Sequence, residues 1–96
     1  MYVLVRRDLD VTYRCVQGGH AISKFALDHY DKLKEWNNNT IVYLGVPNEY
    51  VLNLWVSKLE DKEKIYSCFI EPDLGDKITS IACVDTGEIF KSLRIV

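Results

Sequence analysis

The sequence lacks the excess of positive charge that proteins use to hold nucleic acid over a wide surface. Its 96 residues include 12 Lys and Arg against 14 Asp and Glu, a formal net charge of −2. Nucleic-acid binders usually carry a basic stripe or a basic domain, so any RNA contact here has to be local. The run EDKEK at residues 60–64 mixes both signs, and we interpret it as solvated surface and not as a binding patch.

Cysteine is scarce, and its positions do not suit cross-linking or metal binding. Cys15, Cys68 and Cys83 are odd in number and show neither a Cys-x-x-Cys pair nor another spacing typical of metal ligands. These features argue against a disulfide framework and against a zinc site. We expect three buried or partly buried thiols in a reducing compartment.

Long apolar runs and several ligand-binding motifs are also missing. The apolar stretch at residues 1–5 is followed at once by Arg6, whereas a signal peptide or a membrane-spanning helix needs a longer run. We therefore predict a cytoplasmic protein with no membrane partner. The glycines form neither Gly-x-Gly-x-x-Gly nor Gly-x-x-x-x-Gly-Lys, and no serine or cysteine nucleophile motif is present.

The sequence does contain enough apolar material for one packed core. Its composition is 48% hydrophobic and 27% charged, which is ordinary for a globular protein. A chain of this length has room for one domain, which we assign to residues 1–96. No internal repeat, low-complexity tract or linker interrupts it.

Hydrophobic periodicity predicts strands that alternate with helices. Short β-rich runs indicate strands at residues 2–5, 40–46, 65–70 and 78–84. A helical period runs over residues 15–36, and a second one follows Asn48, a good N-cap residue. The tail at residues 86–93 is expected to hold one short helix at most.

This order of elements defines the expected fold. The first two connections are helical crossovers, which join parallel strands, whereas the last two strands follow each other directly. We therefore predict an α/β fold, a single compact domain in which helices flank a mixed four-stranded sheet.

Ligands of open α/β sheets bind beyond the carboxyl ends of the strands. Here that edge gathers charged and polar residues that follow the first strand or begin the first helix, namely Arg6, Arg7, Asp8, Asp10, Arg14, Gln17 and His20. Glu71 and Asp73 follow the third strand and are expected at the same edge. Asp8, Glu71 and Asp73 show no calcium-loop spacing, so we predict no metal site.

Gly18 and Gly19 stand in the expected first turn of the long helix. A helix N-terminus presents unpaired N–H groups and partial positive charge, which suit a phosphate or an oxyanion. Gln17 and His20 are three residues apart and share a helix face. The alternative is that His20 only packs and hydrogen-bonds, and that the glycines let the helix approach the sheet.

Four segments carry a resemblance to a known family. YVLVRRDL, VQGGHAISKF, TIVYLGVPNEYVLNL and EPDLGDKITSIAC, in this order, resemble the second, archaeal and eukaryotic type of peptidyl-tRNA hydrolase, which also has compact bacterial and phage relatives. The likeness covers nearly the whole chain, and its specificity lies in the ordered combination. It implies a four-stranded mixed sheet, a homodimer, and hydrolysis of the ester between a peptide and tRNA without a metal or organic cofactor.

The resemblance also implies site residues. Gln17 and His20 match the family's Gln-x-x-His-Ala segment, and Asp8 matches the acidic residue after its first strand. Asp73 resembles the family's aspartate after the third strand, and Thr79 a threonine in the last strand.

Two features depart from the family pattern. The family's lysine, four residues before the glutamine, falls on Tyr13, with Arg14 next to it. A long glycine-rich loop before the last strand is shortened to LGDKI.

These matches lead to a hypothesis for the reaction. Asp73, His20 and Thr79 are the candidate catalytic residues, with Asp73 orienting or activating the attacking water. The N–H groups of Gly18 and Gly19 and the side chain of Gln17 would stabilise the oxyanion. Substrate binding to phosphate or to the terminal adenosine falls to the arginines of the edge, Arg6, Arg7 and Arg14.

Two other functions remain open. A non-catalytic binding module of the same fold, holding a nucleotide, an RNA end or a protein partner, is favoured by Tyr13 in place of the lysine. A structural dimer, used in an assembly or as an inhibitor of an enzyme, is the third class, and an exposed apolar patch on one helix would favour it.

Overall fold

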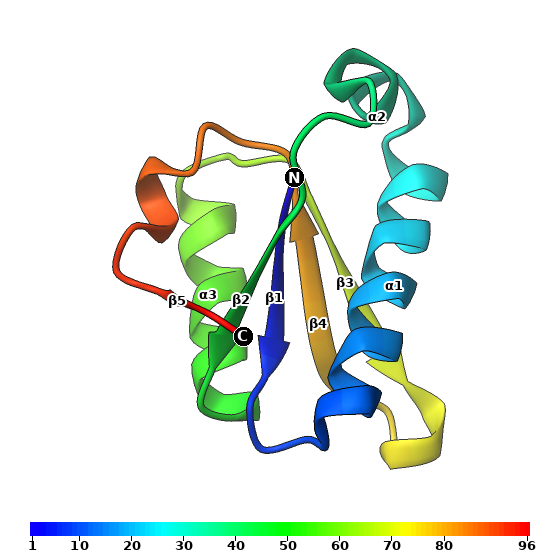
Figure 1. Cartoon of the computed structure of the whole chain (residues 1–96), viewed down its shortest axis with the longest axis vertical. Coiled ribbons are helices and arrows are strands. Elements are labelled where there is room, and N and C mark those ends of the chain that lie inside the picture. The colour runs from blue at the N-terminus through cyan, green and yellow to red at the C-terminus, as the bar shows by residue number, and fades with distance from the viewer.

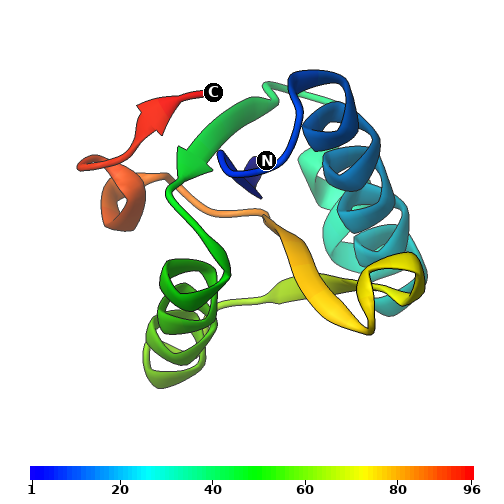
Figure 2. The same ribbon diagram turned by 90° about the horizontal axis from the view of Figure 1, so that it is seen from below.

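In the computed structural model, which describes residues 1–96, a mixed five-stranded sheet lies between two layers of helix (Figure 1). The strands are β1 (Tyr2–Arg6), β2 (Val42–Val46), β3 (Tyr66–Glu71), β4 (Lys77–Cys83) and β5 (Arg94–Ile95). The helices are α1 (Val11–Asp28), α2 (Tyr30–Trp36) and α3 (Glu49–Asp61), with short 3₁₀ turns at Pro72–Leu74 and Glu88–Phe90. Helices α1 and α2 cover one face of the sheet and α3 covers the other, as Figure 1 and Figure 2 show.

The strand directions confirm the prediction of a mixed sheet with helical crossovers. The spatial order is β3-β4-β1-β2-β5, and β1 pairs with β2 in parallel and with β4 antiparallel. Because β3 is also antiparallel to β4, the strands β1, β2 and β3 run in one direction. Their carboxyl ends therefore meet at one edge of the sheet, at the bottom of Figure 1.

The predicted number of strands was wrong, because the tail adds a fifth. In β5, Ile95 lies opposite Leu44 and Arg94 lies opposite Gly45, antiparallel to β2. Both residues of β5 are exposed, so backbone bonds to the edge of β2 hold this strand and burial contributes little. A strand of two exposed residues leaves no hydrophobic period in the sequence, which explains why the pattern predicted only a short helix there.

The core is divided between the two faces of the central strand, β1. Leu4 faces α3 and belongs to the larger group of buried residues, whereas Val3 and Val5 face α1, as the alternation of side chains along a strand requires. All three side chains are completely buried. β1 thus joins the two halves of the core and fixes the positions of α1 and α3 on either side.

The long helix starts earlier than predicted and is interrupted before its predicted end. It begins at Val11, four residues before the predicted start, because the Asp10 carboxylate caps it by accepting from the Thr12 N–H at 3.1 Å. It breaks at His29, whose backbone is not helical and whose ring nitrogen lies 2.9 Å from the Tyr66 carbonyl. The predicted single helix is therefore two, α1 and α2.

Strand β3 is one edge of the sheet, and its neighbour β4 carries one extra residue. The pairing steps from Phe69 opposite Ser80 to Ile70 opposite Ile78, so Thr79 is the additional residue of a bulge in β4. None of the three helices combines the length and apolar character that crossing a bilayer requires.

The tail is expected to contribute to stability through Phe90. This side chain is 2% exposed, and its ring centroid lies 5.2 Å from that of Tyr2 and 5.4 Å from that of Trp55. Phe90→Ala should lower the free energy of unfolding by about 3–5 kcal/mol, measured by urea denaturation. The control Ile95→Ala removes a side chain that is 75% exposed and should change it by less than about 0.5 kcal/mol. Equal losses of stability in Phe90→Ala and Ile95→Ala would contradict the packing of Phe90 in the core.

Candidate functional site

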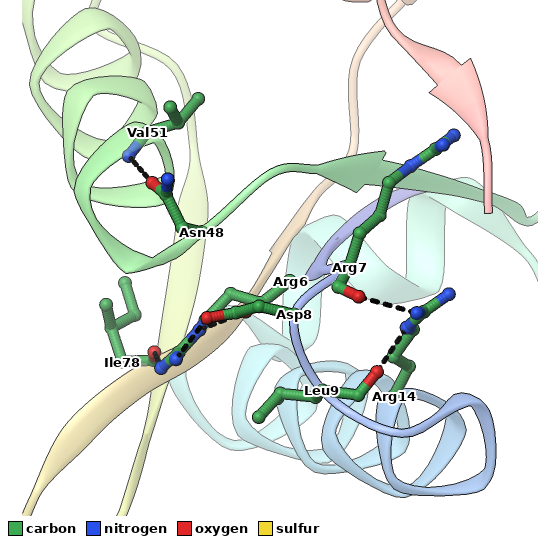
Figure 3. A network of polar contacts seen from close by, with 8 residues as sticks. All are labelled: Arg6, Arg7, Asp8, Leu9, Arg14, Asn48, Val51 and Ile78. Atoms are coloured by element: carbon green, nitrogen blue, oxygen red, sulfur yellow. Dashed lines mark hydrogen bonds and ion pairs between the residues drawn. The ribbon is translucent and has the colours of Figure 1, made fainter.

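The carboxyl edge of the sheet gathers the predicted site residues in two separate groups. The first surrounds Glu71 at the end of β3 and connects it to α1 and β4. The second lies in the loop between β1 and α1 and consists mainly of arginine contacts (Figure 3). No hydrogen bond or ion pair joins the two groups.

Gln17 is the connecting residue of the first group. Its side chain is completely buried, its Nε2 donates to Glu71 Oε1 at 2.9 Å, and its Oε1 accepts from Thr79 Oγ1 at 2.5 Å. Its backbone carbonyl accepts from Ser80 Oγ at 2.6 Å. Because both ends of the amide are engaged, Gln17 fixes the carboxylate of Glu71 and is not aimed at solvent.

Glu71 is the centre of this arrangement, which we call the Glu71 cluster (Tyr13, Gln17, Glu71 and Thr79). The Glu71 residue is 8% exposed and its carboxylate also accepts from Tyr13 Oη at 3.2 Å and from the Asp73 N–H at 3.3 Å. The hydrogen bond from Gln17 holds the pKa of Glu71 below its usual value, against the opposing effect of desolvation. Glu71 is therefore ionised at neutral pH.

Tyr13 provides the hydroxyl of the cluster. Desolvation and the neighbouring Glu71 carboxylate raise the pKa of Tyr13, so its hydroxyl stays protonated and acts as a donor. The sequence places this tyrosine where the resembled family has a lysine. The structure therefore puts a neutral donor, and no cation, in contact with the carboxylate.

Asp73 is held near the cluster by its backbone and not by its side chain. It lies in the 3₁₀ turn Pro72–Leu74, where its N–H donates to Glu71. The residue is exposed, and its carboxylate forms no hydrogen bond or ion pair. The structure thus brings Glu71, and not the predicted catalytic residue Asp73, into contact with Gln17.

His20 lies next to the cluster on the solvent side. Its ring stacks on that of Phe69, with centroids 4.4 Å apart and planes inclined by 12°. Gln17 and His20 share a face of α1, and Phe69 lies two residues before Glu71 in β3, so the stacked pair of rings lies next to the cluster. His20 is exposed, so this aromatic pair is open to a ligand.

The predicted anion site at Gly18 and Gly19 was wrong, because both residues lie inside α1 and not in its first turn. At this depth in a helix, an N–H donates to the carbonyl four residues earlier and is not available to a ligand. Gly18 is buried, and a Cβ there would lie 2.3 Å from the ring of Tyr43. Gly18 therefore lets β2 pack closely against the helix, as the alternative interpretation proposed, whereas Gly19 has no neighbour within 4 Å.

In the second group, Arg6 is already neutralised. Its Nε and Nη2 donate to the two carboxylate oxygens of Asp8 at 3.0 and 2.9 Å, and its Nη1 donates to the Ile78 carbonyl at 3.0 Å (Figure 3). The hydrogen bond from Arg6 lowers the pKa of Asp8. Asp8 makes no contact with the Glu71 cluster, so these two predicted site residues form an internal pair.

Arg7 and Arg14 keep their positive charges. Arg14 donates to the backbone carbonyls of Leu9 at 2.7 Å and of Arg7 at 2.5 Å, as Figure 3 shows, and Arg7 donates to the Ile95 carbonyl at 3.0 Å. Carbonyl groups carry no net charge, and neither arginine has a carboxylate partner. These two guanidinium groups are the uncompensated cations of the loop.

Comparison with known proteins adds no relative: no protein-family model matches the chain, and no curated protein matches it. The resemblance to peptidyl-tRNA hydrolases rests on the quoted motifs alone and stays a prediction. In the structure, no group of three or more His, Cys, Asp or Glu side chains is arranged to hold a metal ion.

Glu71 should make the stability of the fold depend on pH in the acid range. Because its pKa is lower in the folded state, its ionised form stabilises the fold fully above the ordinary glutamate pKa of about 4.3, and this stabilisation is lost as the pH falls below that value through the lower pKa of the folded state. Glu71→Gln should therefore lose less stability than the wild type between about pH 6 and pH 3, measured by urea denaturation at each pH. Asp73→Asn is the matched control and should follow the wild type. Parallel curves for the wild type and Glu71→Gln would count against the ionised cluster.

Proposed function

We propose that the protein hydrolyses the ester of peptidyl-tRNA, or a similar aminoacyl ester, at the Glu71 cluster without a metal ion. The observation that carries this proposal is the ionised carboxylate of Glu71, fixed by Gln17 and Tyr13 at the carboxyl end of β3. The ordered motifs of the sequence support the same activity. Glu71 takes the role that the motifs alone assigned to Asp73.

Glu71 holds the attacking water. Its Oε2 accepts one long hydrogen bond, from the Asp73 N–H at 3.3 Å, so this oxygen keeps capacity to accept from water. The water oxygen attacks the ester carbonyl carbon while its proton passes to Glu71. The bond between the carbonyl carbon and the ribose oxygen then breaks, and the proton moves to the ribose oxygen. The products are the peptide acid and free tRNA.

The surrounding residues divide the remaining tasks. Gln17 and Thr79 are positioning residues, because both side chains are buried, Thr79 donates to Gln17, and Gln17 in turn donates to Glu71. The ring of His20, next to the cluster, is the donor that stabilises the oxyanion, because the single proton of the Tyr13 hydroxyl is already donated to Glu71. It replaces the glycine N–H groups, which the helix itself uses.

Recognition of the tRNA end uses the aromatic pair and the two free arginines. Single-stranded bases stack on exposed aromatic rings, and the pair of His20 and Phe69 lies next to the cluster, since Phe69 is two residues before Glu71 in β3. Arg7 and Arg14 supply the positive charge for phosphate. Because the protein as a whole is slightly acidic, this binding depends on a few contacts and is sensitive to salt.

A turnover assay with purified peptidyl-tRNA tests the reaction and the identity of the carboxylate. The wild type should release free tRNA, and Glu71→Gln should lower kcat/KM by roughly 100-fold or more because the water loses its acceptor. Asp73→Asn should stay within roughly fivefold of the wild type, because its carboxylate makes no contact in the cluster. Loss of activity in Asp73→Asn alone would return the role to Asp73, and no release by the wild type would rule out the hydrolase.

A binding module is the second candidate, and Tyr13 is the observation that favours it. A neutral hydroxyl stands beside Glu71, and Arg6 at the same edge of the sheet is neutralised by Asp8, so neither of these residues supplies a free positive charge next to the carboxylate. Such a module would hold an RNA end without cleaving it.

Tyr13→Lys distinguishes the two functions. If the protein is a hydrolase, a cation beside Glu71 should raise kcat/KM by roughly tenfold, since it stabilises the negative charge of the transition state. Tyr30→Lys adds the same charge on the exposed surface of α2 and should have no effect. Tight tRNA binding by the wild type, with no release by either variant, would instead favour the binding module.

A further inference from the structure

Four lysines converge on one hollow in the surface, at the end of α3. The hollow has a volume of about 450 Å³ and is lined by Lys58, Lys62, Lys64, Glu88, Ile89, Lys91 and Ser92. Glu88 is the one acidic residue among the residues that line it, against four lysines, whereas the whole chain has more acidic than basic residues. We call this place the lysine hollow.

The fold brings together lysines that alternate with acidic residues in the sequence. Lys58 and Lys62 are one helical turn apart and share a face of α3. The next residue, Glu63, has a left-handed backbone with a φ of 55°, and the Lys64 N–H donates to the Leu59 carbonyl at 2.9 Å. This reversal brings Lys64 back to the same hollow. Glu60 lies outside it and accepts from Tyr66 Oη at 2.6 Å.

The lysine charges are only partly balanced. Lys64 pairs with Asp85 and Lys91 with Glu88, each at 2.9 Å. The pair of Lys91 and Glu88 is highly exposed and therefore weak, and Lys62 has no carboxylate partner. Like charges four residues apart destabilise a helix, so the face shared by Lys58 and Lys62 carries a repulsion that the protein itself does not remove.

A structural role at the end of the helix explains only part of this arrangement. Lysines near a helix C-terminus interact favourably with its dipole, which accounts for Lys58 and Lys62. Lys58 also lies over the ring of Trp55, with its Nζ 4.7 Å from the centroid. Neither reason applies to Lys91, which reaches the same hollow from the tail, more than 25 residues later in the chain.

We propose that the lysine hollow binds clustered phosphate groups. Each ammonium group offers three donors on a flexible stem, which suits the several oxygens of adjacent phosphates, and Ser92 adds a hydroxyl. The ligand is a free polyphosphate or the backbone of a nucleic acid, which share this chemistry.

The lysine hollow is separate from the Glu71 cluster and does not depend on the proposed hydrolase function. It lies at the C-terminal end of α3, on the face of the sheet opposite α1. The Glu71 cluster lies between α1 and the sheet, at the edge where α3 begins. Since α3 has 13 residues, the two ends of this helix are about 20 Å apart.

Isothermal titration calorimetry with sodium tripolyphosphate and with a short RNA hairpin tests the proposal. The double variant Lys62→Gln with Lys91→Gln should weaken binding by roughly tenfold or more, because two charged contacts are lost. The matched control, Lys34→Gln with Lys77→Gln, makes the same change in net charge at exposed positions outside the hollow and should stay within roughly twofold. The four substituted lysines, Lys34, Lys62, Lys77 and Lys91, are all exposed, so both double variants should fold.

The two ligands identify the source of the phosphate. Binding of tripolyphosphate alone, with the expected loss in the double variant, assigns the hollow to free polyphosphate. Binding of the hairpin with the same loss, and with a smaller salt dependence in the double variant, assigns it to nucleic acid. The proposal is overturned if neither ligand binds at millimolar concentration or if the control weakens binding equally. Glu71→Gln should leave the binding of phosphate at the lysine hollow unchanged. A failure of the hydrolase proposal can therefore be told apart from a failure of this one.

Discussion

The buried amide of Gln17 is the contact on which the arrangement of the site depends. A side-chain amide needs partners for its donor and its acceptor when it is removed from water. Here Glu71 accepts at one end and Thr79 donates at the other, so one side chain ties α1 to two strands. The same bonds that satisfy the amide hold a carboxylate ionised at the sheet edge. The hydrogen bonds of Gln17 therefore both hold α1 on the sheet and position the carboxylate of the candidate site.

Much of the fold follows from patterns that a sequence displays directly. The continuous apolar run of β1 and the cap at Asn48 predicted elements that the structure confirms. The start of α1 could also have been predicted from the sequence, because Asp10 is a good N-cap residue directly before Val11. β5 could not have been predicted in this way, because it is formed by backbone pairing to β2 and not by side-chain burial.

The site was less predictable, because its key contact joins residues far apart in the chain. The one available signal was Gln17, a polar residue on the apolar face of a helix, where an amide requires a buried partner. Nothing in the local sequence decides between Glu71 and Asp73 as that partner. The answer depends on the direction of the chain at Pro72, which turns the Asp73 side chain toward solvent and leaves Glu71 beneath α1.

The break between α1 and α2 has a consequence for the behaviour of the protein in concentrated solution. An edge strand presents unpaired backbone groups that invite another chain to add to the sheet, the first step of aggregation. At β3 the His29 ring occupies the Tyr66 carbonyl, and the bulge at Thr79 of the neighbouring β4 interrupts the regular pairing further along. A continuous helix would not carry His29 to that position. The break between α1 and α2 therefore helps to protect the β3 edge of the sheet from pairing with another chain.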